Sequence, residues 1–126
     1  MSTLIKGGQV VSPSGALLAD VLVDGETIAA VGAPGTLTGD ETIDATGKYV
    51  LPGGIDAHTH MEMPFGGTFS ADTFETGTRA AAWGGTTTII DFAVQAKGTS
   101  LLATLDKWHA KADGNCSIDY GFHMIE

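Results

Sequence analysis

The sequence predicts an α/β fold in which a β-rich module over residues 1–53 is followed by alternating strands and helices over residues 54–126. In the first part, short β-prone segments are separated by turn residues. In the second part, β-prone runs alternate with segments whose apolar residues follow helical spacing. The composition, with 43% hydrophobic and 17% charged residues, is typical of a globular domain.

The first module is expected to contain short strands joined by tight turns. Residues 12–15 form a turn signal of Ser, Pro and Gly. Asp24 and Gly25 lie between two β-prone runs, and an Asp-Gly pair in that setting strongly predicts a hairpin. Two further strands are predicted at 41–44 and 49–51. A module of this kind is expected to pack against another part of the protein.

The second part is predicted to contain three strands, at 55–60, 86–94 and 118–125, with one helix in each connection. The first helix should begin at Asp72 as N-cap, with Glu75 three residues later in a capping box. The second should follow Ser100 and run to about residue 113. Connections of this length allow parallel crossovers, so half of a doubly wound sheet and the first part of a (β/α)₈ barrel both fit.

His58 and His60 lie at the carboxyl end of the strand predicted at 55–60. Residues i and i+2 of a strand point to the same face about 6.6 Å apart, so the two imidazoles can converge on one metal ion, with Asp56 on the same face. Zinc, iron and manganese are all compatible with imidazole ligands. The spacing alone leaves open the alternative of two unrelated histidines at a strand end.

The charge and the cysteine content exclude several other classes of protein. A net charge of −9 with only six basic residues argues against nucleic-acid binding, and Lys107 and Lys111 are expected to form a solvated helix face. No apolar run is long enough to span a membrane, and the first residues lack the apolar run of a signal peptide. The single cysteine, Cys116, is either a small buried thiol or a reactive one. A cytoplasmic protein is the expectation.

Several segments together resemble the start of the amidohydrolase superfamily. They are residues 4–11, 19–32 and 43–60, the last ending in Asp56-Ala57-His58-Thr59-His60. Residues 63–68 and 84–92 resemble the dihydropyrimidinase and hydantoinase branch most closely. The likeness covers essentially the whole chain, and the ordered series of segments is far more specific than any one of them.

The resemblance implies a fold and a metal centre. Residues 54–126 would form the first three strands and two helices of a (β/α)₈ barrel, and residues 1–53 part of a small β-sandwich assembled from both ends of the polypeptide. His58 and His60 would bind the metal in a centre of two zinc ions bridged by a carboxylated lysine. In the family that lysine, two further histidines and the catalytic aspartate lie beyond Glu126, and Lys97, Lys107 and Lys111 do not occupy the matching place.

The resemblance also implies an activity, which is hydrolysis of the ring amide of cyclic ureides to N-carbamoyl amino acids. The substrates would be 5,6-dihydrouracil, dihydrothymine or 5-substituted hydantoins, and the enzyme a homotetramer. Met63 and Phe65 match a loop that helps to shape the substrate pocket in that branch, with an apolar loop packed on its own barrel as the alternative. Asp56 and Asp91 are interpreted as carboxylates with a supporting or structural role around the site, Asp91 as a buried and hydrogen-bonded one.

Two further histidines are assigned no role as ligands. His123 is interpreted as a residue of the barrel core, because the family pattern has no ligand on that strand. His109 is interpreted as solvent-facing, because it lies on a helix beside two lysines.

Other functions remain possible within the same superfamily. Allantoinase and dihydroorotase share the metal site but need polar contacts for their substrates. The neuronal collapsin-response relatives keep the fold and lack the metal ligands, which the intact His58 and His60 argue against. A barrel needs about 250 residues, so the chain is expected to be an N-terminal portion that is inactive by itself, with a piece that only binds or assembles as the last alternative.

Overall fold

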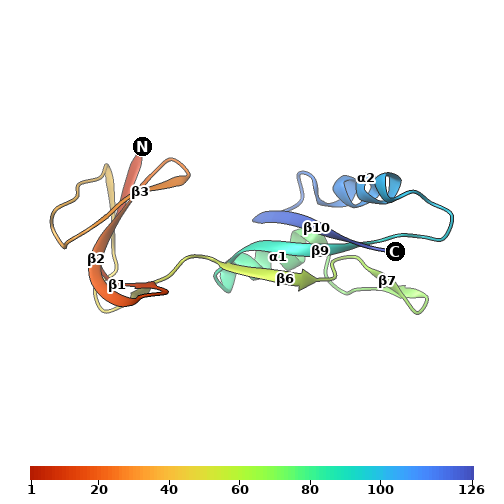
Figure 1. The fold of residues 1–126 in the computed structure, drawn as a ribbon, viewed down its shortest axis with the longest axis horizontal. Helices are drawn as coiled ribbons and strands as arrows, with labels where there is room; N and C mark the ends of the chain where they lie inside the picture. Colours follow the sequence, from red (N-terminus) through yellow and green to blue (C-terminus); the bar gives the residue numbers. More distant parts are fainter. The chain divides into compact units, whose positions relative to one another are not determined.

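A computed structural model describes residues 1–126, which divide into two units, Met1–Pro52 and Gly53–Glu126 (Figure 1). The mixed α/β fold expected from the sequence is present, since the first unit contains strands alone and the second contains strands and helices. Neither helix has the length and apolar character needed to cross a membrane.

The first unit is a five-stranded sheet built around one long strand. Its elements are β1 (Ser2–Ser12), β2 (Gly15–Asp24), β3 (Thr27–Gly32), β4 (Glu41–Asp44) and β5 (Tyr49–Val50). The strands β1, β2 and β3 form an antiparallel meander, while β4 and β5 pair in parallel with different parts of β1. The hairpin predicted at Asp24 and Gly25 is confirmed, because the turn between β2 and β3 lies there.

The strand β1 continues without a break through Gly7 and Gly8. Its pairing with β2 shifts register between Ile5 and Gly8, which is a β-bulge, and Gly7 in the bulge has a φ of 72°. This is a backbone conformation that glycine adopts without steric cost. The glycines therefore bend the strand and do not end it.

A buried carboxylate holds this unit together. The side chain of Asp20 is fully buried and accepts hydrogen bonds from the backbone N–H of Gly7, at 2.8 Å, and of Gly35, at 2.7 Å. The bonds from Gly35 and Gly7 hold the pKa of Asp20 below its ordinary value. Asp20 thus ties the bulge of β1 to the turn that follows β3.

One part of the same unit is left uncovered. An apolar hollow of about 240 Å³ is lined by valine, isoleucine, leucine and proline side chains. They are Ile5, Val10, Val11, Val21, Val23, Ile28, Val31, Val50, Leu51 and Pro52. Ile28, Val31 and Leu51 are also exposed large hydrophobic residues, so this unit does not bury all of its apolar surface by itself.

The second unit is a parallel three-stranded sheet in the order β10-β9-β6 with one helix in each crossover. Its elements are β6 (Gly54–Thr59), α1 (Phe74–Trp83), β9 (Thr86–Val94), α2 (Leu101–Ala112) and β10 (Asp119–Ile125). The predicted parallel alternation is therefore confirmed, and it brings the carboxyl ends of all three strands to one edge.

Both helices pack on the same face of this sheet. Phe74 of α1 and Trp108 of α2 form one core cluster with Ile89 and Ala93 of β9. Ile89, Asp91 and Ala93 alternate along β9 and are all buried, whereas the residues between them are only partly buried. The other face of the sheet carries no helix from this chain.

The first helix begins one residue later than the sequence suggests. Thr73 is the N-cap, because its backbone is extended and its side chain accepts from the N–H of Thr76. The Thr76 hydroxyl accepts from the N–H of Thr73 in return, which completes a capping box. Asp72 accepts from the Thr76 hydroxyl and so supports the cap without forming it. Ser100 caps α2 as predicted.

The segment between β6 and α1 is a small hairpin where the sequence predicts a loop. The strands β7 (Pro64–Phe65) and β8 (Thr68–Phe69) pair in antiparallel fashion. Gly66 and Gly67 connect them with φ values of 59° and 82°, and two central residues with positive φ are what a type I′ turn requires. The two glycines thus fix the turn.

We predict that Asp20→Asn destabilises the first unit at neutral pH, and that its effect becomes smaller as the pH falls. A folded-state pKa below the unfolded value of 3.8 means that the carboxylate stabilises the fold above that pH and loses this effect as the pH falls through the folded pKa. Hydrogen exchange of the Gly7 and Gly35 amides should therefore be faster in the variant at neutral pH, and less sensitive to acidification below about pH 4 than in the wild type.

The control for this change is Asp24→Asn, on the same strand but with an exposed side chain. Unchanged protection of Gly7 and Gly35 in the Asp20 variant would contradict the assignment.

Candidate functional site

His58 is the next-to-last residue of β6. His60 follows directly after the strand ends at Thr59. Their Nε2 atoms are 3.2 Å apart, with the two rings nearly perpendicular at 86°. The predicted convergence of the two imidazoles is therefore present in the structure, at the edge where the parallel strands end.

The geometry depends on an irregularity in β6. Asp56 pairs with Ile89 and Thr59 pairs with Asp91, so β6 advances three residues where β9 advances two. Such a bulge re-aims side chains and is common beside functional sites. The Oδ1 atom of Asp56 accepts from the N–H of His58 at 3.1 Å. The bulge interrupts the regular alternation of side chains along β6. The Asp56 carboxylate binds the backbone of His58 and does not lie beside the imidazoles as predicted.

The two nitrogens fit a metal ion. With Zn–N bonds of 2.0–2.1 Å in tetrahedral geometry, neighbouring ligand atoms lie about 3.3 Å apart, close to the 3.2 Å between His58 and His60. No group of three or more potential ligand side chains exists in the structure. His58 and His60 therefore present two nitrogens that a metal ion could use, without a third side chain to complete a coordination sphere.

The opposite ring nitrogen of His60 is a second relevant feature. Its Nδ1 atom is buried and has no hydrogen-bond partner. A histidine that binds a metal through Nε2 carries its proton on Nδ1 and normally donates it to an acceptor. The side chains in this structure do not supply that acceptor.

Asp91 lies on β9 next to the end of β6, and its side chain is 0% exposed. Its Oδ2 atom accepts from the Thr59 hydroxyl at 2.8 Å and from the N–H of Met61 at 2.7 Å. Its Oδ1 atom accepts from Nε1 of Trp108 at 3.3 Å. Asp91 thus contacts the residues on both sides of His60, together with α2.

Phe92 is a site residue that sequence reasoning did not single out. Its ring centroid lies 4.4 Å from that of His58 and 5.3 Å from that of His60. It lies 5.0 Å from the ring of His123, the residue that pairs with it across the β9–β10 ladder. The available signal was its position, since Phe92 follows Asp91 near the end of a strand parallel to β6. His123 is exposed in this structure and contacts Phe92, without reaching the His58–His60 pair through any hydrogen bond.

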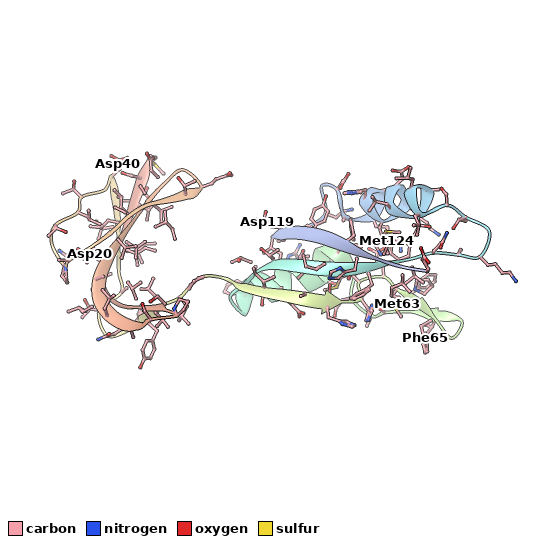
Figure 2. The ribbon with its side chains drawn as sticks, in the orientation of Figure 1. Asp20, Asp40, Met63, Phe65, Asp119 and Met124 are labelled. Atoms are coloured by element: carbon pink, nitrogen blue, oxygen red, sulfur yellow. The ribbon has the colours of Figure 1, made fainter.

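Met63 and Phe65 lie on or beside the hairpin that follows the site (Figure 2). Met63 is half-buried, and its carbonyl accepts from the N–H of Ser70 at 2.9 Å. Phe65 is 76% exposed, so its ring does not pack on this chain. The structure therefore gives Phe65 no core-packing role.

The remaining candidates lie elsewhere on the unit. His109 pairs with Asp113 on α2, through Nδ1 and Oδ1 at 3.1 Å. The hydroxyl of Tyr120 donates to the same carboxylate, which raises the pKa of Tyr120 to about 12. Cys116 is partly buried, and this burial raises the pKa of its thiol, with nearby Asp113 and Asp91 adding to the effect, which fits an unreactive thiol.

The prediction that Lys111 lies on a solvated helix face is wrong, because its side chain is largely buried. Its Nζ atom donates to the carbonyl of Glu62 at 3.1 Å and lies 4.6 Å from the centroid of the Trp108 ring. Lys107 is exposed. The second of the two lysines therefore connects α2 to the segment after His60.

Known proteins with similar sequences include D-hydantoinases and dihydropyrimidinases. The chain is 64% identical to a D-hydantoinase of Streptomyces coelicolor over 98% of its length, and 48% identical to a dihydropyrimidinase of Rattus norvegicus over 96%. These matches cover 27% and 24% of the two enzymes, so the chain spans about a quarter of the length of the relatives it resembles.

Solved structures of dihydropyrimidinases and hydantoinases also superpose on this chain. The chain superposes on a dihydropyrimidinase from Brevibacillus agri with a TM-score of 0.94 and 55% identity, over 98% of this chain and 27% of that one. An L-hydantoinase from Arthrobacter aurescens gives a TM-score of 0.78 at 30% identity, over 95% of this chain and 27% of that one. The model of the amidohydrolase family matches residues 49–118, which include β6, both helices and the His58–His60 pair. The chain belongs to the amidohydrolase family.

Proposed function

We propose that this chain is part of a zinc-dependent cyclic amidohydrolase of the dihydropyrimidinase and hydantoinase type, in which His58 and His60 bind the metal. The whole enzyme would hydrolyse the ring amide of 5,6-dihydrouracil, dihydrothymine or 5-substituted hydantoins to N-carbamoyl amino acids. The observation that carries this proposal is the 3.2 Å approach of the two Nε2 atoms at the end of β6. The names of relatives up to 64% identical support the choice of reaction.

The two histidines have a defined part in this centre. Each would direct the lone pair of Nε2 to the metal and carry its proton on Nδ1. Bound zinc supplies Lewis acidity toward a carbonyl oxygen and lowers the pKa of water. Two imidazoles leave the coordination sphere incomplete, so the bridging lysine, the further histidines and the catalytic aspartate would come from outside residues 1–126.

The uncovered surfaces of both units support a larger fold. In the second unit, β6 and β10 are edge strands, and one face of the sheet carries no helix from this chain. A (β/α)₈ barrel closes such edges and covers that face with its other strands. In the first unit, the 240 Å³ apolar hollow would be covered by the other half of a β-sandwich. We therefore propose that residues 54–126 are the first three strands and two helices of the barrel.

The hairpin after β6 supports an apolar binding site for the ring substituent. Phe65 is exposed in a short hairpin that begins four residues after His60. Substrate pockets are lined mainly by apolar side chains with few polar groups. Phe65, and with it Met63, would contact the 5-substituent of a hydantoin.

The proposal extends to location and assembly. A cytoplasmic enzyme fits a chain with one cysteine, Cys116, which is partly buried in the core. A homotetramer is the assembly that the family resemblance implies.

The ligand assignment predicts that exchanging both His58 and His60 for alanine in the full-length enzyme removes its bound metal and its activity. The reason is that the two imidazoles provide neighbouring ligand atoms that no other side chain in this region replaces. Metal content measured by mass spectrometry of the purified proteins tests this. The control is His109→Ala, on α2 and partly exposed. Full metal occupancy in the double variant would rule out the assignment.

The incomplete site predicts that residues 1–126 alone do not hydrolyse dihydrouracil, because two ligands cannot hold a binuclear centre. Turnover is measured with purified chain and stoichiometric zinc, beside full-length enzyme as positive control. Hydrolysis by the isolated chain, at a rate above that of zinc in buffer, would contradict the proposal.

The pocket assignment predicts that Phe65→Ala in the full-length enzyme changes the preference among substrates. The ratio of kcat/KM for a hydantoin with a large apolar 5-substituent to that for dihydrouracil should fall about tenfold, the usual effect of one apolar contact. The matched control is Phe69→Ala on the paired strand of the same hairpin, which is similarly exposed at 68%. An unchanged ratio would exclude Phe65 from the pocket.

A further inference from the structure

We propose that Asp91 is the positioning residue of the metal site, because its carboxylate binds both neighbours of His60, the side chain of Thr59 and the backbone of Met61. This inference rests on the proposed function, since it concerns the geometry of a metal ligand. It goes beyond that proposal by assigning to a buried residue of β9 control over how well a residue of β6 binds metal.

The first argument is the pattern of hydrogen bonds. Oδ2 of Asp91 receives both the Thr59 hydroxyl and the N–H of Met61, at 2.8 and 2.7 Å. Thr59 precedes His60 and Met61 follows it, so a single oxygen atom binds both neighbours of the ligand. At this point β6 has ended, and the backbone N–H of Met61 has no strand partner. The carboxylate takes the place of the missing ladder bond.

The second argument is that the carboxylate itself cannot move. Asp91 is fully buried on a central strand that pairs on both sides, and its other oxygen accepts from Nε1 of Trp108, which is also buried. Three donors point at two carboxylate oxygens, an arrangement that suits an acceptor-only group. An asparagine of the same shape would have to turn an NH₂ group toward one or two of these donors. Asp91 is therefore a rigid reference point for the backbone at His60.

The third argument is that the segment after His60 is held under strain. Glu62 is the one non-glycine residue with a positive φ, at 50°. Its N–H donates to the carbonyl of Asp72 at 2.9 Å, and its carbonyl accepts from Nζ of Lys111 at 3.1 Å. Backbone in this region persists when surrounding contacts determine it, and such residues cluster at functional sites.

Both helices contact the same segment. The Met61 side chain packs so closely on Gly77 of α1 that a Cβ there would lie 2.4 Å from the Met61 sulfur. Contacts to α1, α2 and β9 thus converge on the three residues 60–62. Asp91 supplies the hydrogen bonds closest to the ligand in this group.

The test is the metal affinity of the full-length enzyme carrying Asp91→Asn, measured by competition with a chromophoric zinc chelator. Loss of a group that orients a metal ligand typically weakens metal binding 10–100-fold, so we expect zinc affinity at least about tenfold lower. The thermal midpoint is recorded with metal and after chelation. The increase in midpoint caused by metal should shrink in the variant, in addition to any change in the metal-free protein.

Two further variants separate positioning from general stability. Phe74→Leu changes the same core without touching the Asp91 bonds, and should lower the metal-free midpoint with zinc affinity within about twofold of wild type. Thr59→Val removes one of the two donors to Oδ2, while the Asp91 carboxylate keeps its bonds from Met61 and Trp108. It should therefore weaken zinc binding by a smaller factor than Asp91→Asn. Thr104→Val, which removes a buried hydroxyl on α2, is its matched control.

The outcomes distinguish this inference from the proposed function. A wild-type enzyme that binds no metal overturns the proposed function and the inference with it. A wild-type enzyme that binds zinc, with Asp91→Asn within about twofold of its affinity, overturns the inference alone. If Asp91→Asn does not fold, unchanged affinity in Thr59→Val overturns it, and weakened binding there with unchanged binding in Thr104→Val supports it.

Discussion

The parallel pairing of β6 with β9 is the constraint on which the second unit depends. It brings the end of β6, with its two histidines, beside Asp91 and Phe92 of the next strand. The pairing is not regular, because β6 carries one extra residue between Asp56 and Thr59. Both carboxylates near this irregularity bind backbone N–H groups that the ladder does not satisfy. The bulge would otherwise leave polar groups without partners, which is costly at a partly buried strand end.

Buried aspartates perform the same physical task in both units. Asp20 accepts from two glycine N–H groups around the bulge of β1, and Asp91 accepts from Met61 and from two side chains around the end of β6. In each case a carboxylate compensates for backbone that has left the regular ladder. Neither position follows from hydrophobic patterning, since each aspartate lies among apolar residues of a strand. A polar residue within an apolar strand marks a place where the backbone needs a partner.

The order and type of the principal elements could be predicted from sequence, because strand and helix periods and turn residues are local properties. The hairpin at Asp24 and Gly25 and the cap at Ser100 are of this kind. The N-cap at Thr73 was missed in favour of Asp72, since both residues can cap a helix and the backbone angles decide. The bulge in β6, the contact of Phe92 with three histidines and the identity of the partners of Asp91 were also missed. They depend on register between strands about thirty residues apart, which no local pattern encodes.

In the proposed enzyme the remaining metal ligands would lie outside residues 1–126, and this separation would have a physical consequence. In the proposed centre, the His-x-His pair at the end of β6 and its contacts with β9, α1 and α2 would organise two nitrogens before the other ligands arrive. Ligands on other strands depend on closure of the whole sheet. The contacts around residues 60–62 come from β9, α1 and α2, all of which belong to the same unit as β6. The histidine pair is thus positioned by contacts within the second unit, and in the proposed enzyme the metal would add its binding energy only when the barrel closes.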